Sequence, residues 1–221
     1  MLNNPISDIA LNVLSADKAA VSVDLADLRC LKKKGMTFTM SAWDIGDIRL
    51  SSINLNAMFG LMKMESAIVT SRDHDVPLFN ADFVSVPKKK TLLVEMYDTC
   101  LGYNMKDWIE KGNAVKAEYD HFKDYPRQAR WYDSQLLDLS LAKRDASLDQ
   151  SKINEIVKKY FLFYKEWYKN SPECKRSEKI AKTAEYVNNL LKQGGSSTDQ
   201  FRSLFGETVT EKLFMTLFGI K

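Results

Sequence analysis

The sequence predicts an α+β fold in which one antiparallel sheet is covered by helices. The first observation is a period near two in the apolar residues between Met36 and Tyr97, which is typical of half-buried strands. The second is a change to helical periodicity after Cys100 that continues almost to the end of the chain. A sheet followed by helices indicates a layered domain, with helices over the faces of the sheet.

The N-terminal element is predicted to be an amphipathic helix over residues 6–20, because Ile9, Val13 and Leu14 share one side. Five short strands follow, joined by tight connections into an antiparallel meander. Gly46, Gly60 and two polar turns separate them. We expect the strands over residues 36–43, 48–59, 61–69, 78–86 and 91–97.

The second half of the chain is predicted to be helical. Residues 194–197, Gly-Gly-Ser-Ser, interrupt the pattern before the last two helices, and Gly206 separates those two. We expect helices over residues 106–118, 130–142, 153–169, 177–193, 198–205 and 208–218.

Composition bounds the class of protein. The 221 residues are 45% hydrophobic and 28% charged, with nine Gly, five Pro and no long polar linker, so we expect one domain over residues 1–221. No apolar run approaches the roughly 20 residues needed to cross a bilayer. The first residues also lack the basic and apolar regions of a signal peptide, which favours a cytoplasmic protein.

Cysteine and histidine usage argues against a resident metal. Cys30, Cys100 and Cys174 lie far apart without a paired spacing, so neither a disulfide framework nor a zinc or iron–sulfur site is expected. The two histidines, His74 and His121, are too few for a histidine-rich metal site.

Asp82 is the most unusual residue of the predicted sheet. It lies within a strand, where Val, Ile or Tyr is normally favoured, and the alternation places it on the same face as Leu78, Asn80 and Val84. If that face is covered, desolvation raises the pKa of the carboxyl and makes it an acid near neutral pH. The alternatives are a face open to water, or an Asp82 that serves as a hydrogen-bond acceptor in a turn.

Two segments carry a resemblance to a known family. Val76-Pro77 with Phe79 and Asp82 forms the first, and Phe205-Gly206-Glu207 with the closing Leu217-Phe218 forms the second. The chain thereby resembles the ferredoxin-dependent bilin reductases and the related red chlorophyll catabolite reductases over about residues 36–221. That family carries Leu-Pro and then Phe-Gly-x-Asp in a strand, and closes with a Phe-Gly-Glu helix ending in Leu-Phe.

The resemblance implies an α/β/α sandwich that holds an open-chain tetrapyrrole between an antiparallel sheet and the C-terminal helices. Enzymes of this family bind no metal or flavin. They take electrons one at a time from reduced ferredoxin, while acidic side chains supply protons. The strand aspartate of the family is the central proton donor, and it maps onto Asp82.

Two further positions of the family are less well matched. One, on the preceding strand, where better-known members of the family place a histidine or an asparagine, falls on Glu65, which would share the cavity with Asp82 or else mark the polar side of that strand. The other falls on Gly195, and the nearest carboxylate, Asp199, does not match the motif. This departure leaves open which double bond is reduced, whether two or four electrons are used, and whether the protein only binds its ligand.

Other residues are candidate substrate contacts. Arg49 and Arg202 carry guanidinium groups that would pair with propionates, or else are surface residues. Met64 and Phe214 would form apolar walls for a flat bilin, and Asn80 replaces the glycine of the family motif. The aromatic residues at 160–168 fit either such a wall or the core.

Two lysine runs, at residues 32–34 and 88–90, lie in predicted turns of a chain with net charge +3 and a pI near 8.6. Such runs are usually solvated surface, but they also suit an acidic ferredoxin, because charge complementarity speeds transient encounters. Nucleic acid is the rival partner, although no binding motif for it is present. We expect a monomer or homodimer.

The sequence therefore predicts an oxidoreductase that reduces a linear tetrapyrrole, biliverdin or a related bilin, with electrons from ferredoxin. It would be cytoplasmic, or stromal in a plastid. A non-catalytic bilin carrier on the same scaffold is the alternative. A third reading is an α+β interaction module in which the motif matches are accidental.

Overall fold

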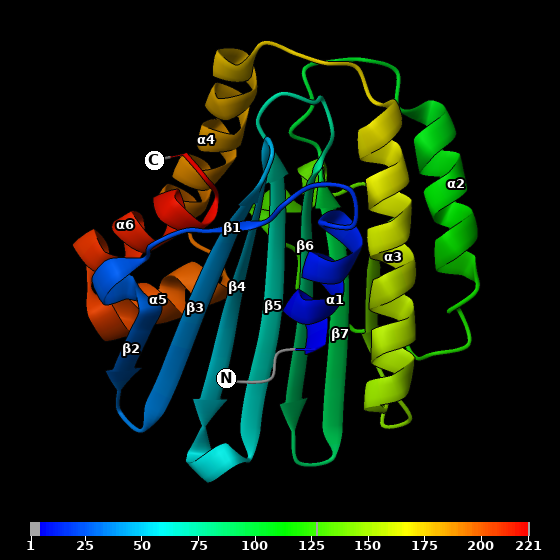
Figure 1. Ribbon diagram of the computed structural model, residues 1–221. Coiled ribbons are helices and arrows are strands. Elements are labelled where there is room, and N and C mark those ends of the chain that lie inside the picture. The colour runs from blue at the N-terminus through cyan, green and yellow to red at the C-terminus, as the bar shows by residue number, and fades with distance from the viewer. Residues whose placement is uncertain (1–4, 127, 221) are drawn as a thin grey trace.

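The computed structural model describes residues 5–126 and 128–220 of the chain (Figure 1). An eight-stranded antiparallel sheet forms its centre. The strands are β1 (Val21–Ser22), β2 (Cys30–Lys33), β3 (Met36–Ile45), β4 (Ile48–Ala57), β5 (Met62–Ser71), β6 (Leu78–Val86), β7 (Lys89–Tyr97) and β8 (Leu141–Arg144). The helices are α1 (Pro5–Leu14), α2 (Lys106–Ala117), α3 (Gln150–Asn170), α4 (Arg176–Gln193), α5 (Ser196–Phe205) and α6 (Glu207–Leu217), with short 3₁₀ turns at Ala26–Arg29, Met58–Gly60 and Trp131–Gln135.

The sheet is a meander in the order β1-β3-β4-β5-β6-β7-β8, and β2 pairs with another part of β3. The five predicted strands correspond to β3–β7, which confirms this part of the prediction. Strands β1, β2 and β8 were not predicted. They are two to four residues long, too short to show a period.

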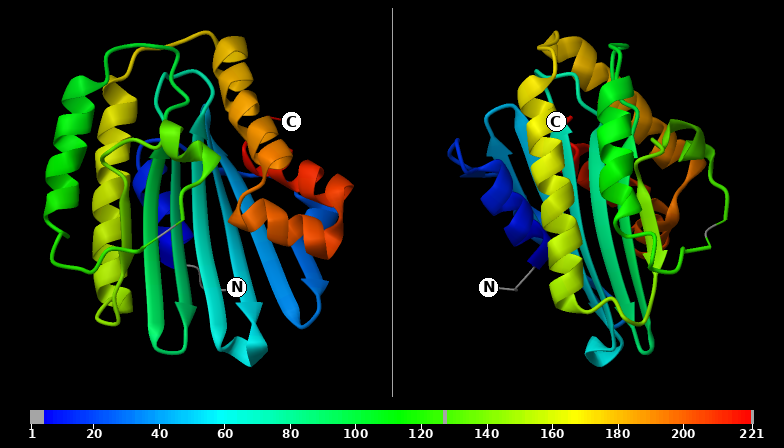
Figure 2. Two further views of the ribbon diagram at one scale, coloured as in Figure 1. Left: turned by 180° about the vertical axis from the view of Figure 1, so that it is seen from behind. Right: turned by 90° about the vertical axis from the view of Figure 1, so that its right-hand side faces the viewer.

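Helices cover both faces of the sheet, so that it forms the middle layer (Figure 2). Helices α1 and α3 pack on one face, and α2 lies beside α3. Helices α4–α6 pack on the other face. Along β6, Phe79, Ala81 and Phe83 belong to the α1–α3 side, whereas Leu78 belongs to the α4–α6 side. The α+β fold predicted from periodicity is confirmed, and its layers are those of the expected α/β/α sandwich.

The aromatic residues of α3 are core residues. Phe161, Tyr164 and Trp167 are fully buried. The ring of Phe79 on β6 lies 4.7 Å from that of Phe161 and 5.3 Å from that of Tyr164. This packing occupies the face of the sheet opposite α4–α6, so these aromatic residues hold α3 in place and are not a wall for a ligand on the α4–α6 side.

A buried ion pair attaches α4 to the start of β6. The Lys179 ammonium donates to Asp75 Oδ1 at 3.2 Å and to the carbonyl oxygens of Val76 and Thr99 at 2.6 and 2.8 Å. Both side chains of the pair are buried. Because an unpaired buried charge is costly, this contact sets where α4 lies against the sheet.

Two predicted helices differ from the structure. The first ends at Leu14 instead of residue 20, where the Ser15 hydroxyl bonds back to the Leu11 carbonyl oxygen. The helix expected over residues 130–142 is absent: a 3₁₀ turn is followed by an extended segment and β8. Pairing with β7, including the bond from Leu137 N to Met96 O at 2.9 Å, outweighs the local helical pattern.

Within the described part of the chain, no helix is both long and apolar enough to span a bilayer.

Candidate active site

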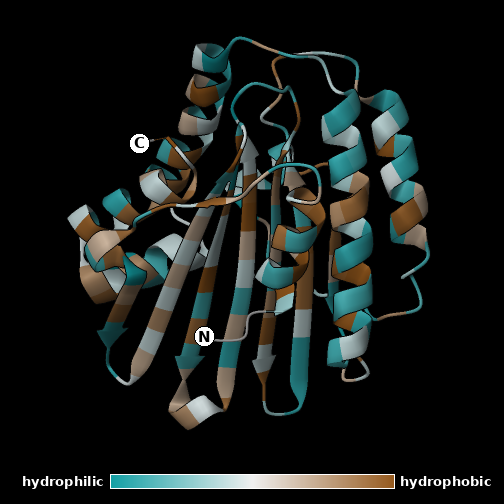
Figure 3. Ribbon diagram, viewed as in Figure 1, coloured by the Kyte–Doolittle hydropathy of each residue, from teal (hydrophilic) through white to brown (hydrophobic). Residues whose placement is uncertain are grey.

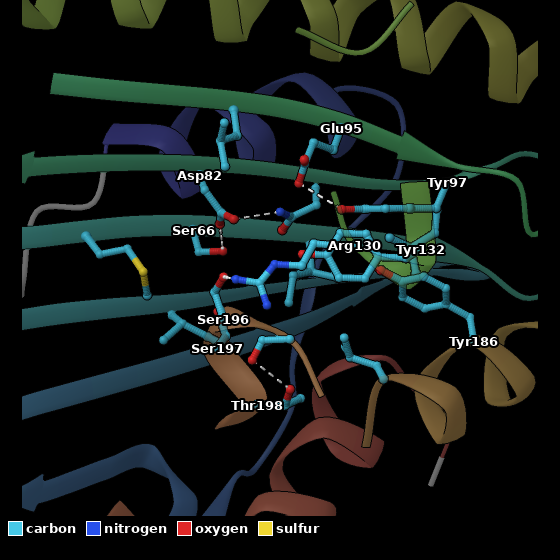
Figure 4. Close-up of a pocket in the computed structure, with 18 of the residues that line it drawn as sticks. Ser66, Asp82, Glu95, Tyr97, Arg130, Tyr132, Tyr186, Ser196, Ser197 and Thr198 are labelled. Carbon is cyan, nitrogen blue, oxygen red and sulfur yellow. Dashed lines mark hydrogen bonds between the residues drawn. The ribbon is translucent and has the colours of Figure 1, made fainter. Parts of the chain in front are cut away.

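A cavity of about 400 Å³ lies between the sheet and helices α4–α6 (Figure 4). Its floor consists of side chains from β4–β7, and its walls come from α4, α5, α6 and from Tyr125, Pro126, Gln128, Arg130 and Tyr132. Trp131 ties this part of the chain to the end of α4, because its indole N–H donates to the Gly194 carbonyl oxygen at 2.8 Å. The volume is within the usual range for small-molecule sites.

Asp82 lies on the floor, on β6, between two hydrogen-bond donors. Ser66 is its direct partner on β5 and donates its hydroxyl to Asp82 Oδ1. The Asn80 side-chain amide donates to Asp82 Oδ2 at 2.8 Å. Leu78, Asn80 and Asp82 all line the cavity, as the alternation along this strand predicts.

The surroundings of Asp82 raise the pKa of its carboxyl. Desolvation by the covering helices is the largest cause, and the bonds from Ser66 and Asn80 oppose it by stabilising the carboxylate. A raised pKa means that the carboxyl holds its proton at a higher pH than an exposed aspartate does. The group can therefore act as a general acid toward a ligand in the cavity.

A second carboxyl, Glu95, lines the same cavity. Glu95 is the partner of Asn80 across the β6–β7 ladder and is only 5% exposed. It accepts a hydrogen bond from the Tyr97 hydroxyl at 2.8 Å. The Tyr97 ring packs against that of Tyr186 on α4, with centroids 5.0 Å apart. Burial, together with Tyr186 and Glu95, raises the pKa of Tyr97 well above its ordinary value.

Two arginines also line the cavity. Arg144 on β8 donates from Nε to Thr91 Oγ1 at 3.0 Å and stacks on the Tyr125 ring at 4.1 Å. Arg130 extends toward Ser196 at the start of α5, with 3.5 Å between its Nη2 and the serine Oγ (Figure 4). Both are placed where a guanidinium could pair with an anionic group of a ligand.

The predicted arginine contacts lie elsewhere. Arg49 is buried, donates to Asp44 Oδ1 at 2.9 Å and to the Thr216 carbonyl oxygen at 2.7 Å, and thus holds the end of α6. Arg202 donates to Glu207 Oε2 at 2.6 Å and to the Leu191 carbonyl oxygen. Neither lines the cavity, so the structure does not bring these two arginines to the site.

Glu65 is also outside the cavity. It lies on β5 beside Ser66, and neighbouring strand residues point to opposite faces of a sheet. Its carboxyl accepts a hydrogen bond from the Ile6 backbone amide of α1, and burial raises its pKa. The structure therefore does not bring Glu65 into the cavity with Asp82.

The remaining predicted contacts line the cavity. Met64 and Phe214 form part of its apolar surface, and Asn80 part of its polar floor. Gly195 also lines it, followed by Ser196, Ser197 and Thr198, so this position carries no carboxylate.

Sequence reasoning missed Glu95, Tyr97, Arg130 and Arg144. Glu95 had a usable signal, because it breaks an apolar strand just as Asp82 does. Arg130 lies in the segment predicted to be helical, and Arg144 follows it on the unpredicted strand β8, so the sequence pattern did not indicate the position of either side chain.

Among the described residues, no group of three or more His, Cys, Asp or Glu side chains is placed to hold a metal ion.

The fold and the cavity define an α/β/α sandwich protein with a carboxyl-bearing site between an antiparallel sheet and the C-terminal helices. The sequence matches no protein-family model and has no significant match among curated proteins. Among solved structures, phytochromobilin synthase from tomato in complex with biliverdin is similar, with a TM-score of 0.75 and 14% sequence identity. The alignment covers 96% of this chain and 81% of that one. This likeness confirms the fold that the family resemblance implied.

Proposed function

We propose that this protein reduces a linear tetrapyrrole, biliverdin or a related bilin, using electrons from ferredoxin. The observation that carries the proposal is Asp82, a carboxyl of raised pKa on the floor of a ligand-sized cavity. The same residue ends the strand motif through which the sequence resembles the bilin reductases. A protein of the same fold has been solved in complex with biliverdin, which supports this class of ligand.

In this reaction Asp82 donates a proton to the bound bilin. A protonated conjugated system accepts an electron more readily, because the added positive charge lowers the energy of the reduced state. Reduced ferredoxin then supplies single electrons, and the substrate passes through a radical. The protein binds no redox group of its own in this scheme, and its contribution is to orient the bilin, exclude water and deliver protons.

The cavity suits a flat ligand with acidic substituents. Met64 and Phe214 offer apolar surface, while Arg130 and Arg144 offer guanidinium groups at its sides. We propose that these two arginines pair with the propionates, in the role first expected of Arg49 and Arg202.

The electron-donor surface is proposed to be the end of the sheet that carries the lysine-rich hairpins. In the antiparallel meander, the β2–β3, β4–β5 and β6–β7 turns all lie at this end (Figure 1). Lys33, Lys34, Lys88 and Lys89 are exposed there, and the ends of β2 and β7 are hydrophilic (Figure 3). Between them, the Phe59 side chain is fully exposed.

An apolar centre with a basic rim fits a transient complex with an acidic protein. Met64, a cavity residue, lies two positions from the start of β5 at Met62. The cavity therefore extends toward this end of the sheet.

The first test is an anaerobic assay of the purified protein with biliverdin, ferredoxin and a ferredoxin-reducing system. Loss of the biliverdin absorption through a radical intermediate to a new bilin is the expected result. Mixing without any spectral change would contradict the proposed ligand class.

A bilin carrier on the same scaffold is the second candidate, favoured by the missing carboxylate at Gly195. Asp82→Asn separates the two functions. For an enzyme, the variant keeps biliverdin affinity within about threefold and loses turnover by about 10²–10⁴-fold, the usual contribution of a general acid. The matched control is Glu65→Gln, which changes a half-buried carboxyl on the other face of the sheet and should leave turnover normal. A wild-type protein that binds biliverdin without ever reducing it would be a carrier.

A further inference from the structure

The floor of the cavity carries a row of polar side chains that crosses three strands. Ser66, Asp82 and Asn80 are joined by hydrogen bonds, and Asn80 faces Glu95 across the β6–β7 ladder. Glu95 in turn is bonded to Tyr97 (Figure 4). Asp82 is thus one of two carboxyls on this floor. The second, Glu95, has its own hydrogen-bond donor in Tyr97.

We propose that Glu95 is a second proton donor to the bilin, acting at a different atom from Asp82. This inference rests on the proposed function. Asp82 pairs with Leu93, two residues before Glu95, so the carboxyl residues are diagonal neighbours on adjacent strands. Such neighbours are roughly 7–8 Å apart, and the two acids would therefore reach separate positions on an extended ligand.

The reaction consumes two protons, and two acids in the cavity could each supply one. Reduction of one carbon–carbon double bond takes up two electrons and two protons and forms two C–H bonds. Two molecules of reduced ferredoxin each lose one electron. Asp82 releases one proton and Glu95 the other, and both remain as carboxylates until they are reprotonated. Among the described residues that line the cavity, Asp82 and Glu95 are the two carboxyls.

Tyr97 provides a route for reprotonation of Glu95. Its hydroxyl already donates to Glu95 Oε2 at 2.8 Å. Because the pKa of Tyr97 is raised well above its ordinary value, the hydroxyl stays neutral and passes a proton on only as it receives another. Tyr186, in ring contact with Tyr97, also lines the cavity.

The test is single-turnover bilin reduction by the wild type, Glu95→Gln and Glu65→Gln under anaerobic conditions. Glu95→Gln should bind biliverdin with affinity within about threefold of the wild type and should form the radical. Decay of that radical to product should slow by about 100-fold or more, as expected on loss of a general acid. Glu65→Gln makes the same chemical change on the other face of the sheet and should leave the decay rate unchanged.

Two further variants separate proton delivery from structural damage. Glu95→Asp keeps a carboxyl and should recover at least a tenth of the wild-type decay rate, while Tyr97→Phe should slow decay and leave radical formation unchanged. Decay in Glu95→Gln within threefold of the wild type would overturn the role of Glu95, although the proposed function would stand. A wild-type protein that fails to reduce the bilin would overturn both.

Discussion

At the scale of single residues, Asp82 shows how burial changes the pKa of a carboxyl. Desolvation raises its pKa, and the hydrogen bonds from Ser66 and Asn80 act in the opposite direction. Because desolvation and the hydrogen bonds oppose each other, the carboxyl keeps its proton at a higher pH than an exposed aspartate but can still release it. An isolated carboxyl in the same cavity, without these donors, would release the proton less readily.

The pH dependence of Ser66→Ala tests this balance. A general acid works while protonated, so the rate falls as pH rises through its pKa. Loss of the Ser66 hydrogen bond removes a contact that stabilises the carboxylate, and the pKa of Asp82 rises further. The alkaline limb of the profile of kcat against pH should therefore move to higher pH. A limb that stays in place or moves to lower pH would show that Asp82 does not control it.

At the scale of elements, the segment between α2 and α3 positions groups that no local pattern indicates. The residues after Trp131 pair with β7, and β8 then presents Arg144 to the cavity. Residues 130–142 have a helical pattern of apolar residues. Backbone hydrogen bonds to the open edge of the sheet stabilise an extended conformation there more than this pattern stabilises a helix. The arginines of the cavity are therefore a product of this tertiary contact.

Arg144→Ala should weaken biliverdin binding by about tenfold or more, because hydrogen bonds to charged groups contribute roughly 1.5–3 kcal/mol. Titration of bilin absorption measures the change. Arg202→Ala removes an arginine that lies outside the cavity and should bind as tightly as the wild type. Equal affinity of Arg144→Ala and the wild type would exclude a propionate contact at this residue.

At the scale of the whole molecule, the two lysine-rich turns lie at the same end of the sheet because the sheet is a meander. Residues 32–34 and 88–90 are far apart in the sequence, yet an antiparallel order brings their turns to one end. Because strand direction alternates, both lysine runs lie at one end of the sheet. Neither run by itself indicates that a basic patch forms there.

Charge reversal at this end tests the electron-donor surface. Lys33→Glu combined with Lys88→Glu should raise the KM for ferredoxin by about tenfold at low salt and leave biliverdin affinity unchanged. The difference should shrink at high salt, because exposed charges are screened. Lys106→Glu with Lys111→Glu on α2 is the control and should have little effect. If the two double variants had equal KM values for ferredoxin at low salt, the ferredoxin-binding surface would lie elsewhere.

The sequence by itself determined the α+β class, the five central strands and the inward face of β6, because a period of two fixes which residues share a face. It identified Asp82 for the same reason. Only the tertiary structure decided that Glu65 lies under α1, that Glu95 shares the floor with Asp82, and that Arg130 and Arg144 replace Arg49 and Arg202 beside the cavity. Periodicity gives the side of a strand but not what covers that side, which depends on helices and edge strands packed from distant parts of the chain.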